Sequence, residues 1–168
     1  MIPMISVVGK SDSGKTTLLE KLIRELTLRG YRIGSIKHDA HSFEIDREGK
    51  DSWRHKQAGA VLTLISSPSK IAMVVDSDHD HTLDELREKF ISNVDLILTE
   101  GYKRENLPKI EVFRSSLRRE MLCTSDDNLI AIAGDPTEVP DGIPVFDLDD
   151  PSLLATFIEQ KFLGKILD

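Results

Sequence analysis

The amino-acid sequence predicts an α/β fold: a mainly parallel sheet, flanked by helices on both faces, with one antiparallel hairpin inserted. Segments with the apolar pattern of strands alternate with segments of helical periodicity. Residues 4–8 and 94–99 are nearly continuous apolar runs, as expected for strands that are covered on both faces. A glycine-containing turn joins the first strand to the first helix. Together these features favour a doubly covered parallel sheet.

The first half of the chain is predicted to begin with a strand at residues 4–8 and a helix at 14–29. Gly30 ends this helix, and one of its faces is apolar, carrying Leu18, Leu19, Leu22, Ile23 and Leu26. The next predicted elements are a strand at 31–38, a short helix at 51–58, and strands at 60–66 and 70–75 that form a hairpin through Pro68.

In the second half, Thr82 and Glu85 have the spacing of a capping box at the start of a helix. Asp150 and Pro151 are predicted to begin the last helix. Between these helices the predicted strands are residues 94–99, 109–113 and 129–133. We find no repeat or linker, so residues 1–168 are expected to form a single domain.

The composition excludes several classes of function. The formal net charge of −7 argues against a nucleic-acid or membrane-surface protein, and no apolar run is long enough for a membrane span. The single cysteine, Cys123, has no partner for an internal disulfide, and the N-terminus does not resemble a signal peptide. We therefore expect a cytoplasmic protein.

Residues 9–16, "GKSDSGKT", match the phosphate-binding pattern G-x-x-x-x-G-K-[ST] between a predicted strand and a predicted helix. Glycines allow backbone N–H groups to surround a phosphate, and the helix N-terminus adds a favourable field. The lysine is expected to reach the β- and γ-phosphates, and the threonine hydroxyl to bind Mg²⁺. This P-loop supplies most of the predicted binding residues: Gly9, Ser11, Asp12, Ser13, Gly14, Lys15, Thr16 and Thr17.

Other charged residues follow the strand ends where ligands of parallel sheets gather. Glu100 ends an apolar strand, and we expect it to act with Lys15 in catalysis and with Thr16 in holding Mg²⁺. Asp51 is either a further Mg²⁺ ligand or a simple helix cap. Lys37 either binds phosphate or is solvated.

Four of the five histidines form two closely spaced pairs. His38, which ends the predicted strand at 31–38, and His41 are candidates for contact with a phosphate or a partner. His41 lies in a polar segment at 39–50 that we predict to be a mobile switch. The segment "SDHDHT", which holds His79 and His81, is typical of a solvated loop, and we expect this pair to be structurally neutral.

Three blocks of sequence, "GKSDSGKTTLLEKLIRELTLRGYRIGSIKHDAH", "DREGKDSWRHKQAGA" and "LILTEGYKRENLPKIEVFR", closely resemble the MobB family of molybdopterin-guanine dinucleotide biosynthesis adapters. The resemblance covers about two thirds of the chain and implies a P-loop GTPase that binds GTP and Mg²⁺ and hydrolyses GTP slowly. It also implies that Thr16, Asp51 and Glu100 organise the metal ion and that Lys37 adds positive charge.

The same resemblance implies a homodimer that assists the molybdenum cofactor guanylyltransferase and, further along, molybdenum insertion enzymes. The sequence lacks the guanine motif N-K-x-D, so Asp135, which follows a late strand in "AIAGD", is the candidate for reading the base. Asp135 could equally be a turn residue before Pro136. No arginine or glutamine is obviously placed to speed hydrolysis.

Two alternatives remain open from the sequence. The histidines are compatible with a metal-insertion GTPase chaperone. The P-loop is also compatible with an ATP-dependent kinase or ligase that resembles dethiobiotin synthetase, although we identify no second, substrate-sized site.

Overall fold

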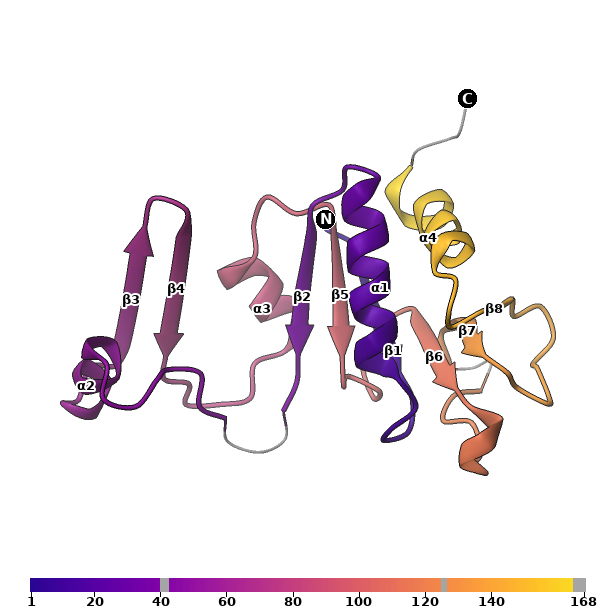
Figure 1. The fold of residues 1–168 in the computed structure, drawn as a ribbon, viewed down its shortest axis with the longest axis horizontal. Helices are drawn as coiled ribbons and strands as arrows, with labels where there is room; N and C mark the ends of the chain where they lie inside the picture. The colour runs from indigo at the N-terminus through magenta and orange to yellow at the C-terminus, as the bar shows by residue number, and fades with distance from the viewer. Residues whose placement is uncertain (40–42, 125–126, 165–168) are drawn as a thin grey trace. The chain divides into compact units, whose positions relative to one another are not determined.

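The structure is a computed structural model that describes residues 1–39, 43–124 and 127–164. It divides into two compact units, which are described separately. The first contains Met1–His38 and the chain from Ile91 onward, and the second is Asp39–Phe90 (Figure 1).

The first unit is built on a parallel sheet, which in the described residues has six strands in the order β2-β5-β1-β6-β7-β8. In the described residues, every strand pair of this sheet is parallel. The strands are β1 (Met4–Val8), β2 (Ile33–Lys37), β5 (Leu96–Glu100), β6 (Lys109–Phe113), β7 (Leu129–Gly134) and β8 (Val145–Phe146). Because they are parallel, their carboxyl ends lie along one edge, where the loop from β1 to α1 also lies (Figure 1).

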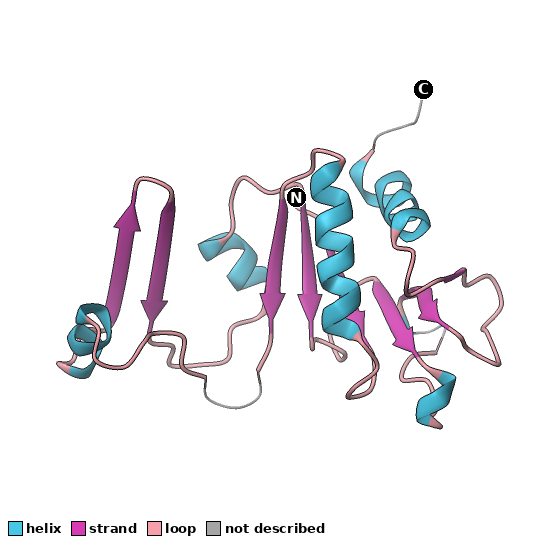
Figure 2. Cartoon of the chain, viewed as in Figure 1, coloured by secondary structure: helices cyan, strands magenta, loops and turns pink. Residues whose placement is uncertain are grey.

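The helices α1 (Lys15–Leu28) and α4 (Ser152–Ile158) pack beside each other over the main core of this unit (Figure 2). A π-helical turn, η3 (Glu159–Leu163), extends α4. Leu18, Leu22 and Leu26 recur at helical spacing on α1 and are fully buried against Ile5 and Val7 of β1. This packing fixes the N-terminus of α1 at the end of β1.

A smaller core cluster joins Val8, Ile132 and Cys123, so the segment after β6 packs against the sheet. This segment begins with the short helix η1 (Ser115–Leu117). The carboxylate of Glu111, which is almost fully buried, accepts hydrogen bonds from the backbone N–H groups of Leu122 (2.6 Å) and Cys123 (2.9 Å). A buried acid therefore positions the chain that leads away from β6.

The second unit contains α2 (Asp51–Gln57), the antiparallel hairpin β3 (Leu62–Ser67) and β4 (Lys70–Val75), and α3 (Leu83–Phe90). The predicted capping box is present at the start of α3: Glu85 N–H donates to Thr82 Oγ1 (3.2 Å), and Thr82 N–H donates to Glu85 Oε2 (2.9 Å).

The predicted α/β fold is confirmed, with its antiparallel pairing confined to the hairpin. Strands 4–8, 70–75 and 109–113 have the predicted bounds, while other elements shift by one or two residues at their ends. The sequence did not predict β8, which has only two residues and is too short for a periodic pattern. In the described part of the chain, no helix combines the length and apolar character required to cross a membrane.

Candidate functional site

The P-loop lies at the carboxyl end of β1 and leads directly into α1. A Cβ atom on Gly9 would lie 2.6 Å from the carbonyl oxygen of Val112 and 2.7 Å from Ser13 Oγ, so only glycine fits there. Gly14 precedes the first helical residue with a φ of 99°, and Asp12 also has a positive φ, of 65°. The loop is thus tightly turned, and it has the backbone curvature of an anion-binding nest.

Polar groups of the P-loop are arranged around this turn. Ser13 is almost fully buried, and its hydroxyl has no hydrogen-bond partner among the described residues. Lys15 Nζ donates to the carbonyl oxygen of Lys10 (2.9 Å), so the ammonium group lies over the loop. An unpaired buried hydroxyl is costly, and a bound phosphate is a ligand that would satisfy it. Ser11, Asp12, Thr16 and Thr17 are exposed.

Thr16 and Glu100 meet although they are 84 residues apart in the sequence. Thr16 Oγ1 donates to the Glu100 carboxylate at 3.1 Å from Oε1 and 3.3 Å from Oε2. Adjacent ligands of an octahedral Mg²⁺ ion lie about 3.0 Å apart when each metal–oxygen distance is about 2.1 Å. The two oxygens therefore fit neighbouring positions of one Mg²⁺ ion with little movement.

Strand β2, which pairs with β5, brings further polar groups to the same edge. Lys37 pairs with Glu100 in the β2–β5 register, and His38 N–H donates to the carbonyl oxygen of Glu100 (3.0 Å). The rings of His38 and Tyr102 are in tilted contact, with centroids 5.0 Å apart. A Cβ on Gly101 would lie 3.2 Å from the His38 carbonyl oxygen, so this approach depends on glycine.

Two arginines support the P-loop, which the sequence did not predict. Arg114 Nε donates to the carbonyl oxygen of Ser13 (2.9 Å), and Arg119 Nη1 donates to that of Ser11 (3.1 Å). Both follow β6, about 100 residues after the loop, so only their place after a strand end could have suggested this role. Their guanidinium groups place positive charge beside the loop.

Asp135 lies just after β7 and is held by the start of η1. Its Oδ1 accepts from Ser115 N–H (2.9 Å) and its Oδ2 from Ser115 Oγ (2.5 Å). These hydrogen bonds, with that from the Ser115 side chain the largest effect, lower the pKa of the Asp135 carboxyl. The residue stays ionised as an acceptor, and it also braces the turn.

A cavity of about 400 Å³ adjoins Asp135 and Arg114 at the carboxyl ends of β7 and β8. Lys21 of α1 donates to two residues of its lining, the Leu148 carbonyl oxygen and Asp149 Oδ1, both at 2.8 Å. The volume is within the range of small-molecule sites. The cavity is lined by Arg114, Ser116, Gly134, Asp135, Val145, Phe146, Asp147, Leu148 and Asp149.

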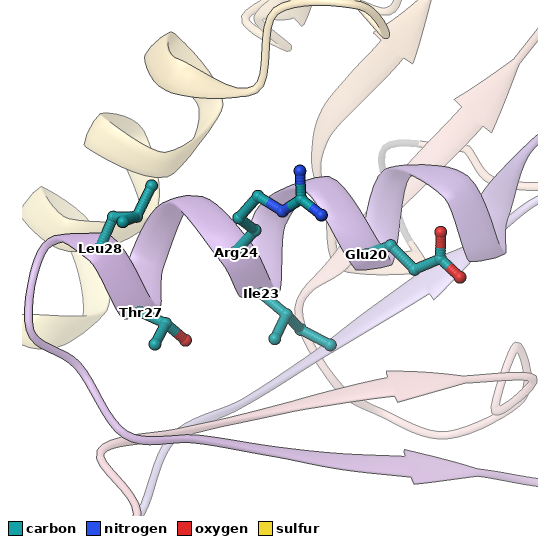
Figure 3. Close-up of a pocket in the computed structure, with 5 residues that line it drawn as sticks. All are labelled: Glu20, Ile23, Arg24, Thr27 and Leu28. Atoms are coloured by element: carbon teal, nitrogen blue, oxygen red, sulfur yellow. The ribbon is translucent and has the colours of Figure 1, made fainter.

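A second hollow, of about 520 Å³, runs along the outer surface of α1. Figure 3 shows that its lining side chains, Glu20, Ile23, Arg24, Thr27 and Leu28, all project from this one helix. Because no other element contributes a polar group, this hollow offers fewer converging polar groups for a ligand than the edge that carries Thr16 and Glu100.

The remaining predicted site residues belong to the second unit or lie outside the described residues. Asp51 is the first residue of α2, is exposed, and forms an ion pair with Arg54 at 3.9 Å. Its role as a Mg²⁺ ligand stays a prediction. His41 lies outside the described residues, as does part of the predicted switch at 39–50. In the described part of that segment, Phe43 and Ile45 are exposed.

Comparison with known proteins gives the chain its family. Residues 4–135 match the family model for MobB, molybdopterin guanine dinucleotide synthesis protein B. The chain belongs to the MobB family. It is similar to the molybdopterin-guanine dinucleotide biosynthesis adapter protein of Haemophilus influenzae, with 38% identity over 95% of this chain and 89% of that protein. The Escherichia coli protein of the same name is also 38% identical, over 95% of this chain and 93% of the relative.

The fold agrees with this assignment. The crystal structure of Bacillus subtilis MobB superposes with a TM-score of 0.76 and 28% identity, covering 98% of this chain and all of that one. The P-loop and the Thr16–Glu100 pair both lie within the segment that matches the MobB model.

Proposed function

We propose that this MobB-family chain binds GTP with Mg²⁺ at the P-loop edge and, in that state, assists the joining of GMP to molybdopterin. The contact between Thr16 and Glu100, at the mouth of a P-loop, carries the proposal. It brings together two expected Mg²⁺ ligands, one from the start of α1 and one from the carboxyl end of β5. The similar proteins of Haemophilus influenzae and Escherichia coli, which are named as adapters of molybdopterin-guanine dinucleotide biosynthesis, support the adapter role.

The chain's own groups would divide the work on the triphosphate. The P-loop N–H groups and the Ser13 hydroxyl bind phosphate oxygens, and Lys15 leaves the Lys10 carbonyl to reach the terminal phosphates. Thr16 and Glu100 hold Mg²⁺, with Asp51 as a further candidate ligand. Bound Mg²⁺ neutralises phosphate charge. Lys37, at the end of β2, adds positive charge at the same edge.

We place the guanine base in the cavity beside Asp135 and Arg114. Guanine presents two adjacent donors, N1–H and the N2 amino group, which a carboxylate accepts well. Asp135 lines this cavity and is ionised, and Asp147 is a second carboxylate on its wall. The Arg114 side chain links the cavity to the P-loop through Ser13.

We expect this chain to hydrolyse GTP slowly, because its arginines near the P-loop contact the loop itself. Arg114 and Arg119 each donate to a P-loop carbonyl oxygen, so these guanidinium contacts brace the loop rather than a reacting phosphate. The nucleotide then sets a conformation that a partner reads, and the molybdenum cofactor guanylyltransferase is the proposed partner. The family match favours this function over metal insertion by a chaperone and over an ATP-dependent ligase.

The working form is proposed to be a homodimer, because the hairpin leaves an apolar surface exposed. Cross-strand partners share a face of a two-stranded sheet, and one face of β3–β4 carries five large apolar side chains that are 43–69% exposed. An isolated hairpin is only marginally stable in water. A second copy would cover this hairpin face, which consists of Leu62, Leu64, Ile71, Met73 and Val75.

Titration calorimetry with GTP and ATP, each in the presence of Mg²⁺, tests the nucleotide assignment. We expect one equivalent of GTP to bind and ATP to bind at least about tenfold more weakly, since adenine lacks the two adjacent donors that guanine offers to a carboxylate. Asp135→Asn and Asp147→Asn identify the carboxylate that reads guanine, because an amide presents a donor where guanine requires an acceptor. Equal binding of ATP and GTP would contradict the guanine assignment.

A further inference from the structure

We propose that His79, His81 and Glu85 form a binding site for a divalent transition-metal ion such as Zn²⁺, independent of the nucleotide site. One ligand atom from each residue lies within 4.8 Å of the other two, and no other such group of three is present in the residues that the structure describes. Two imidazoles and one carboxylate are a known ligand set for zinc with an open fourth position.

The separations between the ligand atoms suit a single ion. Glu85 Oε1 lies 3.6 Å from His79 Nε2, and Glu85 Oε2 lies 3.7 Å from His81 Nδ1. Two ligands of a tetrahedral zinc ion lie about 3.4 Å apart when each metal–ligand distance is about 2.0–2.1 Å. Small rotations of side chains that are already adjacent are therefore sufficient to form the site.

His81 provides a second, independent observation that points to a bound metal ion in this cluster. Its side chain is only 18% exposed, so it is not the solvated residue that the sequence suggested. Its Nδ1 atom is buried and has no hydrogen-bond partner in the described part of the chain. The ring is held between His79, with centroids 4.1 Å apart, and Phe90, with centroids 6.0 Å apart. A metal ion would satisfy the unpaired nitrogen.

Neighbouring groups orient the other two ligands. His79 Nδ1 lies 2.6 Å from Asp78 Oδ1, which leaves Nε2 to face Glu85. A carboxylate behind a metal-binding histidine is a common arrangement that fixes the ring and its tautomer. Glu85 Oε2 accepts from Thr82 N–H (2.9 Å) and Thr82 Oγ1 (3.1 Å), so the helix cap holds the carboxylate while Oε1 faces His79.

One cation already lies close to this carboxylate. Lys89 Nζ is 3.5 Å from Glu85 Oε1, and both side chains are partly exposed. A metal ion would compete with this surface ion pair, which contributes little to stability. Replacing Lys89 with alanine should therefore strengthen metal binding. If Glu85 served only to cap the helix, the same substitution would not change the affinity for metal.

Metal binding is tested on the full chain after chelator treatment, with excess Mg²⁺ present to saturate the Thr16–Glu100 site. Co²⁺ is titrated by its visible absorption and then displaced by Zn²⁺. We expect one equivalent of Co²⁺ in a low-symmetry, nitrogen- and oxygen-bound site. His81→Ala and His79→Ala should each weaken binding by about 100-fold or more, Glu85→Gln by at least about tenfold, and Asp78→Ala by about 10- to 100-fold.

His55→Ala is the matched control, because His55 is an exposed histidine on α2 of the same unit. Glu85→Gln keeps a carbonyl oxygen for the Thr82 cap, so it separates loss of a ligand from loss of the helix start. Circular dichroism verifies that each variant is folded. The proposal is overturned if the wild type binds no stoichiometric Co²⁺, or if His81→Ala and His55→Ala bind it equally.

Discussion

Replacing Glu100 with glutamine should uncouple GTP binding from Mg²⁺. Thr16 Oγ1 donates to the Glu100 carboxylate at 3.1 Å, and a glutamine carbonyl oxygen can accept the same hydrogen bond. The substitution therefore keeps the shape of the P-loop edge and removes one negative charge next to the proposed metal position. Any large effect should depend on the presence of the metal ion.

The expected magnitude follows from the geometry. Two unit charges 4 Å apart interact by about 4 kcal/mol at an effective dielectric constant of about 20. Glu100 is partly buried, so solvent screens the interaction, and the glutamine oxygen can still bind the ion or its water weakly. We therefore expect a loss of about 2 kcal/mol, which corresponds to about a 30-fold weaker affinity for GTP with Mg²⁺.

The assay is titration calorimetry of GTP in Mg²⁺ and in EDTA. In EDTA the carboxylate of Glu100 and the phosphates are like charges, so Glu100→Gln should bind GTP as tightly as the wild type or more tightly. Glu20→Gln is the control, since it makes the same change at an exposed position of α1. If Glu100→Gln weakens GTP equally in Mg²⁺ and in EDTA, Glu100 does not act through the metal ion.

Three further predictions concern the loop, the cysteine and the hairpin. Gly9→Ala should lower the free energy of unfolding by about 2–4 kcal/mol and abolish GTP binding, because its Cβ would lie 2.6 Å from a backbone oxygen. Gly30→Ala, where φ is 92° and the space is open, should cost only about 1 kcal/mol in urea unfolding; similar losses for both would remove the steric argument. Burial, aided by the charge of Glu111, raises the pKa of the Cys123 thiol to about 12. At pH 8 the native protein should therefore react with a disulfide reagent on the order of 10³-fold more slowly than the unfolded chain, and faster as the pH rises; rates within tenfold of each other would contradict this. Leu64→Asp should give a monomer in analytical ultracentrifugation, whereas Leu28→Asp, which changes an exposed leucine of α1, should leave the mass unchanged; a dimer in both variants would place the interface elsewhere.

Local patterns in the sequence were sufficient for most of the fold. The strand at residues 4–8 and the helix that begins beside Lys15 follow from apolar runs and helical periodicity, which act over neighbouring residues. The capping box at Thr82 and Glu85 is also a local signal. β8 escaped prediction because a pair of residues has no measurable period, and its pairing with β7 depends on tertiary contact.

The site was predictable only where a motif marks it. The P-loop pattern identified Lys15 and Thr16, and the rule that ligands gather at strand ends suggested Glu100. The supporting role of Arg114 depends on a contact across 101 residues, and no local pattern encodes that contact. The partner of Asp135, Ser115, is likewise known only from the folded chain. The low exposure of the His81 side chain depends on its neighbours in space rather than on the polar residues that flank it.

Reconstituted guanylylation of the molybdenum cofactor most directly tests the central claim that this chain acts as a nucleotide-bound adapter. The guanylyltransferase, GTP, Mg²⁺ and molybdopterin cofactor are combined with the wild-type chain, with Lys15→Ala, or with the exposed control Lys70→Ala. We predict that the wild type and Lys70→Ala increase the yield of the guanine dinucleotide cofactor, while Lys15→Ala does not. Equal stimulation by Lys15→Ala, or no stimulation by the wild type, would contradict the account.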